Sequence, residues 1–545
     1  MALNTENNTM TEPLLSVENL SVRFGRSQPV VDDISFTLYA GETFALVGES
    51  GSGKSITALS VLRLLPNNAT LNAASISLQG ENLLKLSELE LCKIRGRRIG
   101  LIFQDPMSSL NPVMTIGDQV AEAVRQHFPL SNNGVQRRVL ELLQQVELPE
   151  PQQRIKDFPH QLSGGQRQRV MIAIALAGKP DLLIADEPTT SLDVTIQAQI
   201  LALLKSIQQQ TGMALWLISH DLALVSTMAD RVAVMQHGKI VESSSSSDLF
   251  TQAQHPYTRK LLAALPSMQS GLNRCPEEKP PLLQVDNFHC HYPIRKGLFK
   301  RIVGYVRAVD GVSLTIQQGK TLALVGESGC GKTTLGKGLL NLIPGSFGSV
   351  KIDGLDLDGL QGELLRRQRA NIQIVFQDPF SSMNPRMLVG DIIAEGIGAL
   401  HPDIDAVECK GRVRQLLQQV GLPEDAALRY PHEFSGGQRQ RICIARALAV
   451  RPKLIVCDEP TSALDVSVQA QVIRLLKDLQ KEQGISYLFI THDLAVVAEI
   501  ADDVAVMYQG KIIEQGSVGQ VLFKPQHAYT KKLISAVPVL KKEVA

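Results

Sequence analysis

The 545-residue sequence predicts an α/β protein in which one kind of domain occurs twice in tandem. The pattern G-x-x-x-x-G-K-[ST] is found at residues 48–55, as GESGSGKS, and again at residues 326–333, as GESGCGKT. Each match directly follows a short apolar run, which is the strand–loop–helix context that this phosphate-binding pattern requires. Several longer segments also occur twice. These observations indicate two copies of a domain built on a mostly parallel sheet with helices on both faces.

The repeat extends well beyond this loop. The segment IFQDPMSSLNP at residues 102–112 returns as VFQDPFSSMNP at residues 375–385. Lys54 and Lys332 lie 278 residues apart, whereas the later pairs, QLSGGQRQRV with EFSGGQRQRI and LLIADEPTTSLD with LIVCDEPTSALD, lie 272 apart. A spacing that drifts by a few residues and then stays constant indicates one duplicated unit with short loop insertions or deletions.

We place the first domain at residues 13–266 and the second at residues 282–545, a division that suits the length of the chain. Residues 267–281 are rich in Pro, Ser and Gly without apolar periodicity, which predicts a flexible linker. Residues 1–12 are polar, and we expect them to be disordered.

Each domain opens with an alternating apolar pattern, at Leu15–Phe24 and at Leu283–Tyr292, which predicts a small antiparallel layer. Helical periodicity lies between the QDP and SGGQ segments, for example at Val135–Val146 and Val413–Val420, and predicts a helical subdomain. Short apolar runs then alternate with helical stretches such as Ile196–Gln209. That alternation predicts the parallel sheet.

Composition excludes several classes of protein. The net charge of +1 gives no electrostatic basis for binding nucleic acid, and we expect no nucleic-acid partner. No apolar stretch approaches the roughly 20 residues of a membrane span, and the N-terminus lacks the pattern of a signal peptide. The seven cysteines occur singly, without C-x-x-C pairs, which predicts reduced thiols in the cytosol and no structural zinc.

The two phosphate-binding loops carry a definite chemistry. Glycines let backbone N–H groups turn toward a phosphate, and the next helix directs its positive dipole end at the same anion. We expect Lys54 and Lys332 to reach the β- and γ-phosphates, and Ser55 and Thr333 to bind Mg²⁺. The predicted nucleotide-binding residues of these loops are Gly48, Glu49, Ser50, Gly51, Ser52, Gly53, Lys54, Ser55, Gly326, Glu327, Ser328, Gly329, Cys330, Gly331, Lys332, Thr333 and Thr334.

The set GESGSGKS, QDP, LSGGQ, LLIADEP and SHD resembles the ATP-binding-cassette ATPases, and the resemblance covers almost the whole chain twice. It implies two tandem ABC nucleotide-binding domains, each a RecA-like P-loop core with an antiparallel β layer and a helical subdomain. The implied activity is hydrolysis of ATP with Mg²⁺, a reaction that depends on positioning and charge stabilisation. Phe434 stands where the family usually has Leu before SGGQ.

The resemblance also assigns roles. The general bases for the attacking water are Glu187 and Glu459, and the residues that sense the γ-phosphate are His220 and His492. The Mg²⁺ ligands, directly or through water, are Ser55, Thr333, Asp186, Asp458, Gln104 and Gln377. The segments that contact the nucleotide of the other domain, across a head-to-tail pair, are Ser163, Gly164, Gly165 and Gln166, and Ser435, Gly436, Gly437 and Gln438. Candidates for signalling between sites are Asp193 and Asp465, and candidates for adenine stacking are Phe24 and Tyr292.

The subfamily is indicated by HPYTRKLLAALP at His255 and HAYTKKLISAVP at His527, which close the two repeats. With the FQDP-x-SS-[LM]-NP segments, they resemble the dipeptide/oligopeptide importers of the fused two-cassette type, which include glutathione and microcin C-type peptide import ATPases. The implied partners are two membrane permease subunits and an extracytoplasmic solute-binding protein, with this chain at the cytoplasmic face of the inner membrane. The permeases' coupling helices would lie near residues 105–112 and 378–385. Some relatives hold an iron–sulfur cluster with four cysteines, but here only Cys275 lies near such a position, and we expect none.

Other functions remain open at this stage. Nickel chelates and opines are substrates within the same subfamily, and fused sugar-importer ATPases share the two-cassette architecture. Soluble two-cassette ATPases that act on ribosomes normally carry a long charged linker, which differs from the short Pro-containing segment here. A DNA-repair cassette would need zinc-spaced cysteines, which the sequence does not contain.

Two local patterns lead to further expectations. Cys330 lies inside the second phosphate loop at a helix start, where the pKa of a thiol should fall, so we expect it to be reactive and protected by ATP. An equally simple interpretation is that it replaces Ser52 of the first repeat. His289, Cys290 and His291 offer three metal ligands, but adjacent residues of a strand point to opposite faces, and we expect no metal site there.

Overall fold

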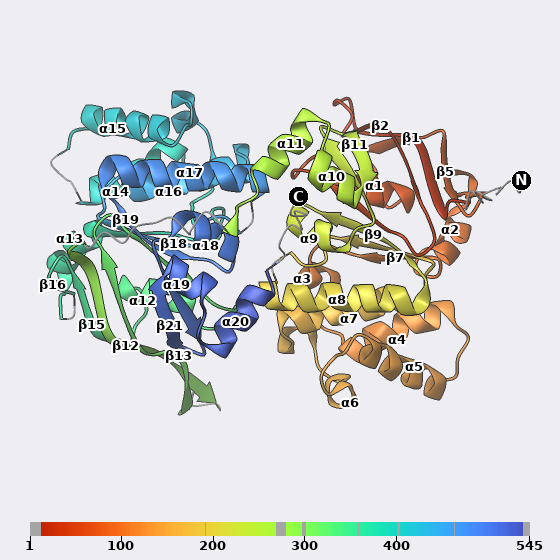
Figure 1. Cartoon of the computed structure of the whole chain (residues 1–545), viewed down its shortest axis with the longest axis horizontal. Helices are drawn as coiled ribbons and strands as arrows, with labels where there is room; N and C mark the ends of the chain where they lie inside the picture. The colour runs from red at the N-terminus through yellow and green to blue at the C-terminus, as the bar shows by residue number, and fades with distance from the viewer. Residues whose placement is uncertain are drawn as a thin grey trace, which may run out of the picture. The chain divides into compact units, whose positions relative to one another are not determined.

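The computed structural model describes residues 12–190, 192–268, 279–296, 301–357, 359–400, 404–462 and 464–537. They form two compact units (Figure 1), of which the first consists mostly of residues up to 265 and the second mostly of residues 266–537. Most of the N-terminal segment predicted to be disordered, and residues 269–278 of the predicted linker, lie outside the described residues. The first strand of the second unit begins at Pro281, the last position of that predicted linker.

A six-stranded sheet, in the order β11-β10-β3-β9-β8-β7, forms the centre of the first unit. All neighbours are parallel except β10 and β11, and every residue of β3, β8 and β9 is buried. Strands covered on both faces read as continuous apolar runs, as these do. The strands are β3 (Thr43–Val47), β7 (Ile99–Ile102), β8 (Leu182–Asp186), β9 (Ala214–Ser219), β10 (Arg231–Gln236) and β11 (Lys239–Ser245).

A smaller antiparallel sheet, in the order β2-β1-β5-β6 with β4 also paired to β1, forms the second layer of this unit. Its central strand β1 alternates buried and exposed positions over much of its length, as the sequence pattern predicts. The strands are β1 (Leu15–Phe24), β2 (Val31–Leu38), β4 (Ala69–Asn72), β5 (Ser75–Leu78) and β6 (Glu81–Asn82).

Helices cover the sheets, and α4, α5 and α7 pack on one another as the predicted helical subdomain. The helices of the first unit are α1 (Lys54–Val61), η1 (Leu83–Lys85), α2 (Glu88–Ile94), α3 (Pro106–Ser109), α4 (Ile116–His127), α5 (Asn132–Gln145), α6 (Pro151–Arg154), η2 (Pro159–Gln161), α7 (Gly164–Leu176), α8 (Val194–Thr211), α9 (Leu222–Met228), α10 (Ser246–Gln252) and α11 (Pro256–Ala263).

The second unit repeats this plan. Its six-stranded sheet has the order β17-β18-β19-β14-β20-β21, with only β20 and β21 antiparallel. Its antiparallel layer has the order β13-β12-β15-β16. The strands are β12 (Pro281–Lys296), β13 (Arg301–Gln317), β14 (Thr321–Val325), β15 (Ser346–Ile352), β16 (Leu355–Asp356), β17 (Ile372–Val375), β18 (Leu454–Asp458), β19 (Ser486–Ile490), β20 (Asp503–Tyr508) and β21 (Lys511–Ser517).

The helices of the second unit follow the same order as those of the first. They are α12 (Lys332–Leu339), α13 (Gly362–Asn371), α14 (Val389–Leu400), α15 (Ala406–Gln419), η4 (Glu424–Leu428), η5 (Pro431–Glu433), α16 (Gly436–Leu448), α17 (Val466–Gln483), α18 (Leu494–Ile500), α19 (Val518–Phe523) and α20 (Ala528–Ser535). None of the helices within the described ranges of the chain has the length and apolar character needed to cross a membrane.

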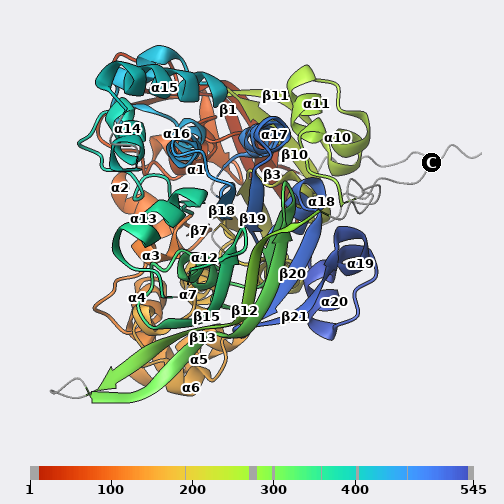
Figure 2. The same ribbon diagram turned by 90° about the vertical axis from the view of Figure 1, so that its left-hand side faces the viewer.

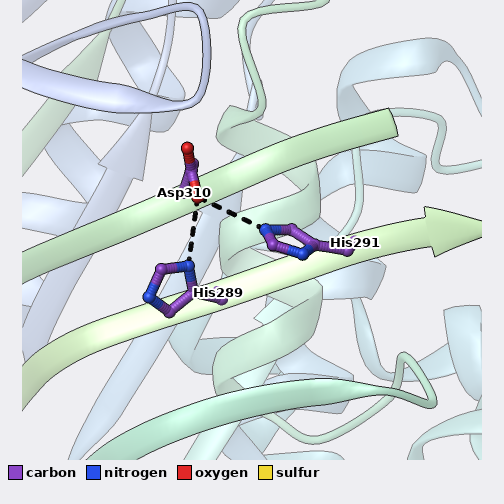
Figure 3. Close-up of side chains that lie close together, drawn as sticks. All are labelled: His289, His291 and Asp310. Atoms are coloured by element: carbon purple, nitrogen blue, oxygen red, sulfur yellow. Dashed lines mark hydrogen bonds and ion pairs between the residues drawn. The ribbon is translucent and has the colours of Figure 1, made fainter. Parts of the chain in front are cut away.

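The hairpin of β12 and β13 is much longer than its counterpart in the first unit and extends away from the other elements of its own unit (Figure 2). His289 pairs with Asp310 across it, and His291 lies two residues further along the same strand (Figure 3). We expected no metal site because adjacent residues of a strand point to opposite faces. Residues two apart share a face, and both imidazoles point at the Asp310 carboxylate. The expectation did not take into account that His289 and His291 lie on one face together with Asp310.

The strand order decides where the polar motifs meet. In each unit the strand before the phosphate loop adjoins the strand that ends before the histidine, and that strand adjoins the one that ends in the aspartate. Because the strands are parallel, their carboxyl ends lie at one edge of the sheet, where ligands of such folds bind. The predicted architecture is confirmed, because each of the two units has a mostly parallel sheet, an antiparallel layer and a helical subdomain.

Candidate nucleotide-binding and catalytic sites

Glycines shape the phosphate loop between β3 and α1. Gly48 and Gly53 have φ angles of 154° and 106°, which residues with a side chain rarely adopt. A Cβ on Gly53 would lie 2.7 Å from the carbonyl oxygen of Val30, and one on Gly48 would lie 2.2 Å from that of Met235. Gly53 is the N-cap of α1 and has no side chain to occupy the first N–H groups of the helix. The loop therefore presents a helix start of the kind that binds phosphate.

The last two residues of this phosphate-binding motif, Lys54 and Ser55, form polar contacts that suit a nucleotide and a cation. The buried Nζ of Lys54 donates to the carbonyl oxygens of Gly48, at 2.7 Å, and Glu49, at 2.9 Å. Ser55 Oγ donates to Asp186 Oδ1 at 3.0 Å. Burial raises the pKa of Asp186 to about 6, although the hydrogen bond from Ser55 acts to lower it. The hydroxyl and the carboxylate form the oxygen donor pair that Mg²⁺ prefers, so these residues fit the ion.

Glu187 lies at the centre of a polar cluster beside this pair. Gln104 Nε2 donates to Glu187 Oε2 at 2.7 Å, and Thr190 Oγ1 donates to the same oxygen at 2.9 Å. His220 Nδ1 lies 3.1 Å from Glu187 Oε1. Burial opposes ionisation of Glu187, but the hydrogen bond and charge of His220 outweigh it and lower the pKa to about 2. The sequence did not identify Thr190, although the DEPTT segment contains it.

The backbone at this glutamate is held in an uncommon conformation. Glu187 has a φ of 48° and Glu459 has a φ of 46°, both in the left-handed region that residues other than Gly, Asn and Asp visit rarely. In each case the amide N–H donates to a carbonyl of the neighbouring strand, that of Ile218 or Ile490, at 2.9 Å. Strain of this kind occurs at functional sites, where the surrounding structure enforces it.

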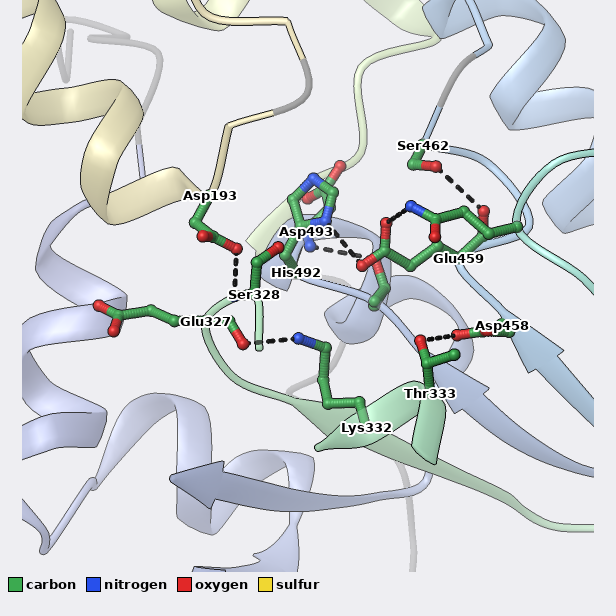
Figure 4. A network of polar contacts seen from close by, with 12 residues as sticks. Asp193, Glu327, Ser328, Lys332, Thr333, Asp458, Glu459, Ser462, His492 and Asp493 are labelled. Atoms are coloured by element: carbon green, nitrogen blue, oxygen red, sulfur yellow. Dashed lines mark hydrogen bonds and ion pairs between the residues drawn. The ribbon is translucent and has the colours of Figure 1, made fainter. Parts of the chain in front are cut away.

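The second unit brings the equivalent residues together in nearly the same geometry (Figure 4). Lys332 Nζ donates to the carbonyl oxygens of Gly326, at 2.7 Å, and Glu327, at 2.9 Å. Thr333 Oγ1 donates to Asp458 Oδ1 at 2.9 Å, and burial raises the pKa of that carboxyl group. The fit to Mg²⁺ is therefore the same in both units.

Glu459 occupies the position of Glu187. Gln377 Nε2 donates to its Oε2 at 2.9 Å, and His492 Nδ1 lies 3.4 Å from its Oε1. Burial opposes the charge on both partners, yet their mutual attraction lowers the pKa of Glu459 and raises that of His492. The structure thus brings together, within each unit, the loop lysine, the hydroxyl, both carboxylates, the glutamine and the histidine that the sequence singled out.

The SGGQ segments form helix starts elsewhere in each unit. Ser163 is the N-cap of α7, and it exchanges hydrogen bonds with Gln166: Ser163 N–H donates to Gln166 Oε1 at 3.0 Å, and Gln166 N–H donates to Ser163 Oγ at 3.3 Å. Ser435 and Gln438 do the same at 3.0 and 3.4 Å before α16. Each serine hydroxyl accepts in this exchange and keeps its own hydrogen to donate to a ligand.

The model of the family described as ABC transporter matches residues 31–190 and again residues 309–462. The chain belongs to the ABC transporter family. It is therefore an ATPase coupled to transport, as the motifs indicate. A second model, described as Oligopeptide/dipeptide transporter, C-terminal region, matches residues 241–295 and 513–545. Both the family and the subfamily expected from the sequence are thus confirmed.

Curated relatives match this ABC protein along nearly its whole length. The Peptidoglycan transport ATP-binding protein YejF of Agrobacterium fabrum is 50% identical over 97% of this chain and 97% of its own. The Glutathione import ATP-binding protein GsiA of Pectobacterium atrosepticum is 45% identical over 96% of this chain and 90% of its own. The protein of the same name in Escherichia coli is 46% identical over the same shares.

The transporter-type C-terminal region of each cassette contacts the phosphate loop, a relationship that the sequence did not reveal. Tyr257, in the HPYT segment, accepts a hydrogen bond through its hydroxyl from the Glu49 N–H at 3.4 Å. Tyr529, in the HAYT segment, accepts one from the Glu327 N–H at 3.0 Å. The repetition of HPYT and HAYT at equivalent positions could have indicated this contact. In the sequence analysis these segments indicated only the subfamily.

The candidate adenine-stacking residues lie at equivalent places in the antiparallel layers. Phe24 is the last residue of β1 and is half-buried, whereas Tyr292 lies within β12 with 41% of its surface exposed. Asp465 is the N-cap of α17, and Asp193 directly precedes α8. These placements are compatible with the expected roles, which stay predictions.

The expected lowering of the Cys330 pKa is contradicted. The thiol is only 7% exposed, and burial raises its pKa although Lys332 lies nearby and opposes the shift. Cys330 belongs to the apolar cluster beneath the loop, together with Leu335 and Val309. Its position at the start of a helix is therefore outweighed by the loss of hydration. The alternative interpretation, in which Cys330 simply replaces Ser52 of the first repeat, agrees with this environment, because the Ser52 side chain is similarly buried, at 5% exposure.

Proposed function

We propose that this chain is the ATP-hydrolysing subunit of an importer for peptides or peptide-like solutes. Separate membrane permeases would form the channel, an extracytoplasmic solute-binding protein would deliver the solute, and the chain would bind at the cytoplasmic face of the inner membrane. The observation that carries this proposal is that both cassettes, and not only the second, end in a match to the oligopeptide/dipeptide transporter region. The names of the relatives, which concern glutathione and peptidoglycan transport, indicate the same class of solute.

We infer that two ATP molecules bind at composite sites, each completed by the SGGQ segment of the other cassette. The first site would combine the side chains around Glu187 with Ser435, Gly436 and Gly437. The second would combine those around Glu459 with Ser163, Gly164 and Gly165. This inference is supported by the SGGQ segments, each of which presents a helix start and a serine hydroxyl hydrogen that suit a phosphate.

Hydrolysis then follows from the geometry of the glutamates. Glu187 and Glu459 are ionised carboxylates whose oxygens contact a glutamine amide and a histidine. A water molecule held in such a cluster can give its proton to the carboxylate as it attacks the γ-phosphate. The lysines would bind the phosphates. Mg²⁺, when held by the hydroxyl–carboxylate pairs, neutralises charge on the phosphate oxygens.

The permease would dock on the segments that follow the glutamines. In the first unit, Phe103 and Val113 flank this segment with 47% and 79% of their surfaces exposed, and in the second unit Phe380 is 49% exposed. Exposed apolar side chains beside polar ones are typical of protein interaction surfaces. Because Gln104 contacts the catalytic Glu187 directly, movement of this segment would reach the reaction centre.

A test uses the full-length chain with Glu187→Gln and Glu459→Gln combined, which binds ATP without hydrolysing it. Tagged protein trapped with ATP in cells of its host should co-purify with multi-span membrane proteins, and the wild-type chain without ATP should retain fewer. Uptake is then measured in a strain lacking the chain, with labelled glutathione, a dipeptide and a peptidoglycan-derived peptide. Loss of uptake of at least one peptide, restored by the wild-type gene, is the expected result. Co-purification of ribosomes in place of membrane proteins would overturn the proposal, and loss of sugar, nickel chelate or opine uptake would change the solute.

A further inference from the structure

Two histidines and one aspartate converge on the long hairpin of the second unit, outside the nucleotide site. His289 Nδ1 lies 3.2 Å from Asp310 Oδ1, and His291 Nε2 lies 3.4 Å from the same oxygen (Figure 3). All three ligand atoms lie within 4.8 Å of one another. The three side chains are 18%, 21% and 19% exposed, so an ion could enter from solvent and still be largely enclosed.

Both ring nitrogens of His289 have an oxygen neighbour. Nε2 lies 3.0 Å from Asn287 Oδ1, and Nδ1 lies 3.2 Å from Asp310 Oδ1, so the tautomer decides which nitrogen donates. When Nε2 carries the proton and donates it to Asn287, the lone pair of Nδ1 is directed into the cluster and can bind a metal ion. Metal-binding histidines usually have this arrangement, in which the second ring nitrogen donates to an oxygen that fixes the tautomer.

His291 provides an independent indication. Its Nε2 is buried and, among the residues that the structure describes, forms no hydrogen bond of normal geometry. Buried polar atoms in proteins nearly always have such a partner, and an unpaired one requires an explanation. The ring packs edge-on to Phe347 at 5.6 Å, and His289 stacks on the same phenyl ring at 4.7 Å. Phe347 thus holds both imidazoles in the orientation that directs their nitrogens at Asp310.

The carboxylate divides its two oxygens between different partners. Asp310 Oδ1 faces the imidazoles, whereas Oδ2 lies 3.7 Å from Arg307 Nη1 and 3.9 Å from Lys511 Nζ. Arg307 and Lys511 are 69% and 64% exposed, so water screens their repulsion of a bound cation. Oδ1 is therefore the oxygen that faces both imidazoles and is available to a metal ion.

We propose that His289, His291 and Asp310 form a site for a divalent transition-metal ion such as Zn²⁺. Two imidazoles and a carboxylate are the donors of many such sites, whereas Mg²⁺ and Ca²⁺ prefer oxygen ligands throughout. Three protein ligands leave a further coordination position for water. The ion would join β12 to β13 near Tyr292, the candidate adenine-stacking residue.

The first repeat shows what this hairpin looks like without the histidines. Asp32 corresponds to Asp310, because each donates its N–H to the glycine of the equivalent turn, Gly238 or Gly510, at 2.8 and 2.9 Å. Asp32 Oδ2 lies 3.1 Å from Lys239 Nζ, with which it forms an ion pair. Ser21 and Arg23 occupy the positions of the two histidines. The proposed site therefore belongs to the second cassette. Ser21 and Arg23 of the first cassette show which residues the same fold tolerates at the positions of the two histidines.

The experiment compares tag-free wild-type protein with the double variant His289→Ser/His291→Arg, which carries the residues of the first repeat. After treatment with a chelator and buffer exchange, each protein is titrated with Zn²⁺ alone against a chromophoric chelator, and its thermal midpoint is recorded with and without Zn²⁺. Cys92→Ser serves as the matched control, because Cys92 is an exposed thiol outside the cluster. Asp310→Asn tests the carboxylate separately.

We expect the wild type and Cys92→Ser to bind one more equivalent of Zn²⁺ than the double variant, and only they should gain thermal stability from it. Asp310→Asn should bind this equivalent at least about tenfold more weakly, as the loss of an anionic partner of a metal site typically does. Equal binding by the wild type and the double variant would overturn the proposal. So would wild-type protein that shows no saturable Zn²⁺ binding, since the histidines would then share only a proton with Asp310; that result does not depend on whether the variants fold.

Discussion

The hydroxyl of Tyr529 accepts a hydrogen bond from the backbone N–H of Glu327, the second residue of the second phosphate loop, at 3.0 Å. A helix in the transporter-type C-terminal region thereby contacts the loop that is predicted to bind phosphate. The helix carrying the tyrosine is itself fixed, because Glu514 accepts the N–H groups of Gln526, at 2.7 Å, and His527, at 3.1 Å. The C-terminal region thus positions a loop that lies 202 residues earlier in the chain.

Tyr529→Phe should weaken nucleotide binding at the second cassette. The substitution removes the acceptor and leaves the Glu327 N–H without this partner, a loss of about 1 kcal/mol, or roughly fivefold in affinity. Tyr257→Phe is the matched variant in the first cassette, and because its hydrogen bond is longer, at 3.4 Å, the effect there should be smaller. Titration with a fluorescent ATP analogue measures both. Unchanged affinity in Tyr529→Phe would show that the tyrosine only packs.

Glu187→Gln and Glu459→Gln should each remove most of the ATPase activity of the chain. Each variant keeps the shape of the side chain but loses the carboxylate that accepts the proton, a change typically worth about 10²- to 10⁴-fold. Steady-state phosphate release from the purified chain, with and without membranes that contain the permeases, measures the effect. If only one of the two substitutions reduces the ATPase activity, the site of the other glutamate is regulatory. The two clusters would then differ in function despite their similar geometry.

Cys330 should react slowly with alkylating reagents at neutral pH. Its thiol is buried and its pKa is raised by that burial, so little thiolate is present and access is poor. Cys92 is exposed and provides the internal comparison. Mass spectrometry of peptides after timed labelling with iodoacetamide should find Cys92 modified well before Cys330. Rapid, ATP-sensitive labelling of Cys330 would restore the expectation that the structure has contradicted.

Gly331→Ala should abolish nucleotide binding at the second cassette. A Cβ at this position would lie 2.1 Å from the carbonyl oxygen of Ala308, and the φ of 111° is unfavourable for alanine. Gly411, within α15, is the matched control, because a Cβ there meets nothing within 4 Å. Gly411→Ala should leave ATP binding unchanged and raise the stability of the chain by about 0.5–1 kcal/mol. Thermal unfolding and ATP titration of both variants test this pair, and normal ATP binding by Gly331→Ala would contradict the predicted clash.

Local sequence was sufficient for many of the elements and for most of the residues that the structure brings together around each phosphate loop. β1 spans Leu15–Phe24, the range that the alternating pattern predicted, and α8 includes the predicted helical stretch Ile196–Gln209. The aspartates at strand ends and the histidines after strands could be found because a parallel sheet brings such ends to one edge. Each of these predictions depends on residues that are close in sequence or on a repeated pattern.

The remaining features depend on contacts between distant segments. Thr190 and Tyr529 acquire their positions by the glutamate and the phosphate loop only when the sheets are assembled. Burial of Cys330 also comes from tertiary packing, and it reversed the direction of the expected pKa shift. The start of a helix by itself would lower the pKa of a thiol. Here the thiol is packed in the core beneath the loop, where water cannot stabilise the thiolate, and the pKa is raised instead.

By itself, the sequence determined that this protein has two phosphate-binding domains, because phosphate binding requires fixed residue types at fixed spacings. The ABC family and the peptide-transporter type were indicated by the resemblance of its other motifs to that family. Tertiary structure alone decided that His289 and His291 meet Asp310, which lies about twenty positions along the chain on the neighbouring strand. The register of an antiparallel pair is set by the whole sheet and its bulges, and no local pattern states which side chains it will bring face to face.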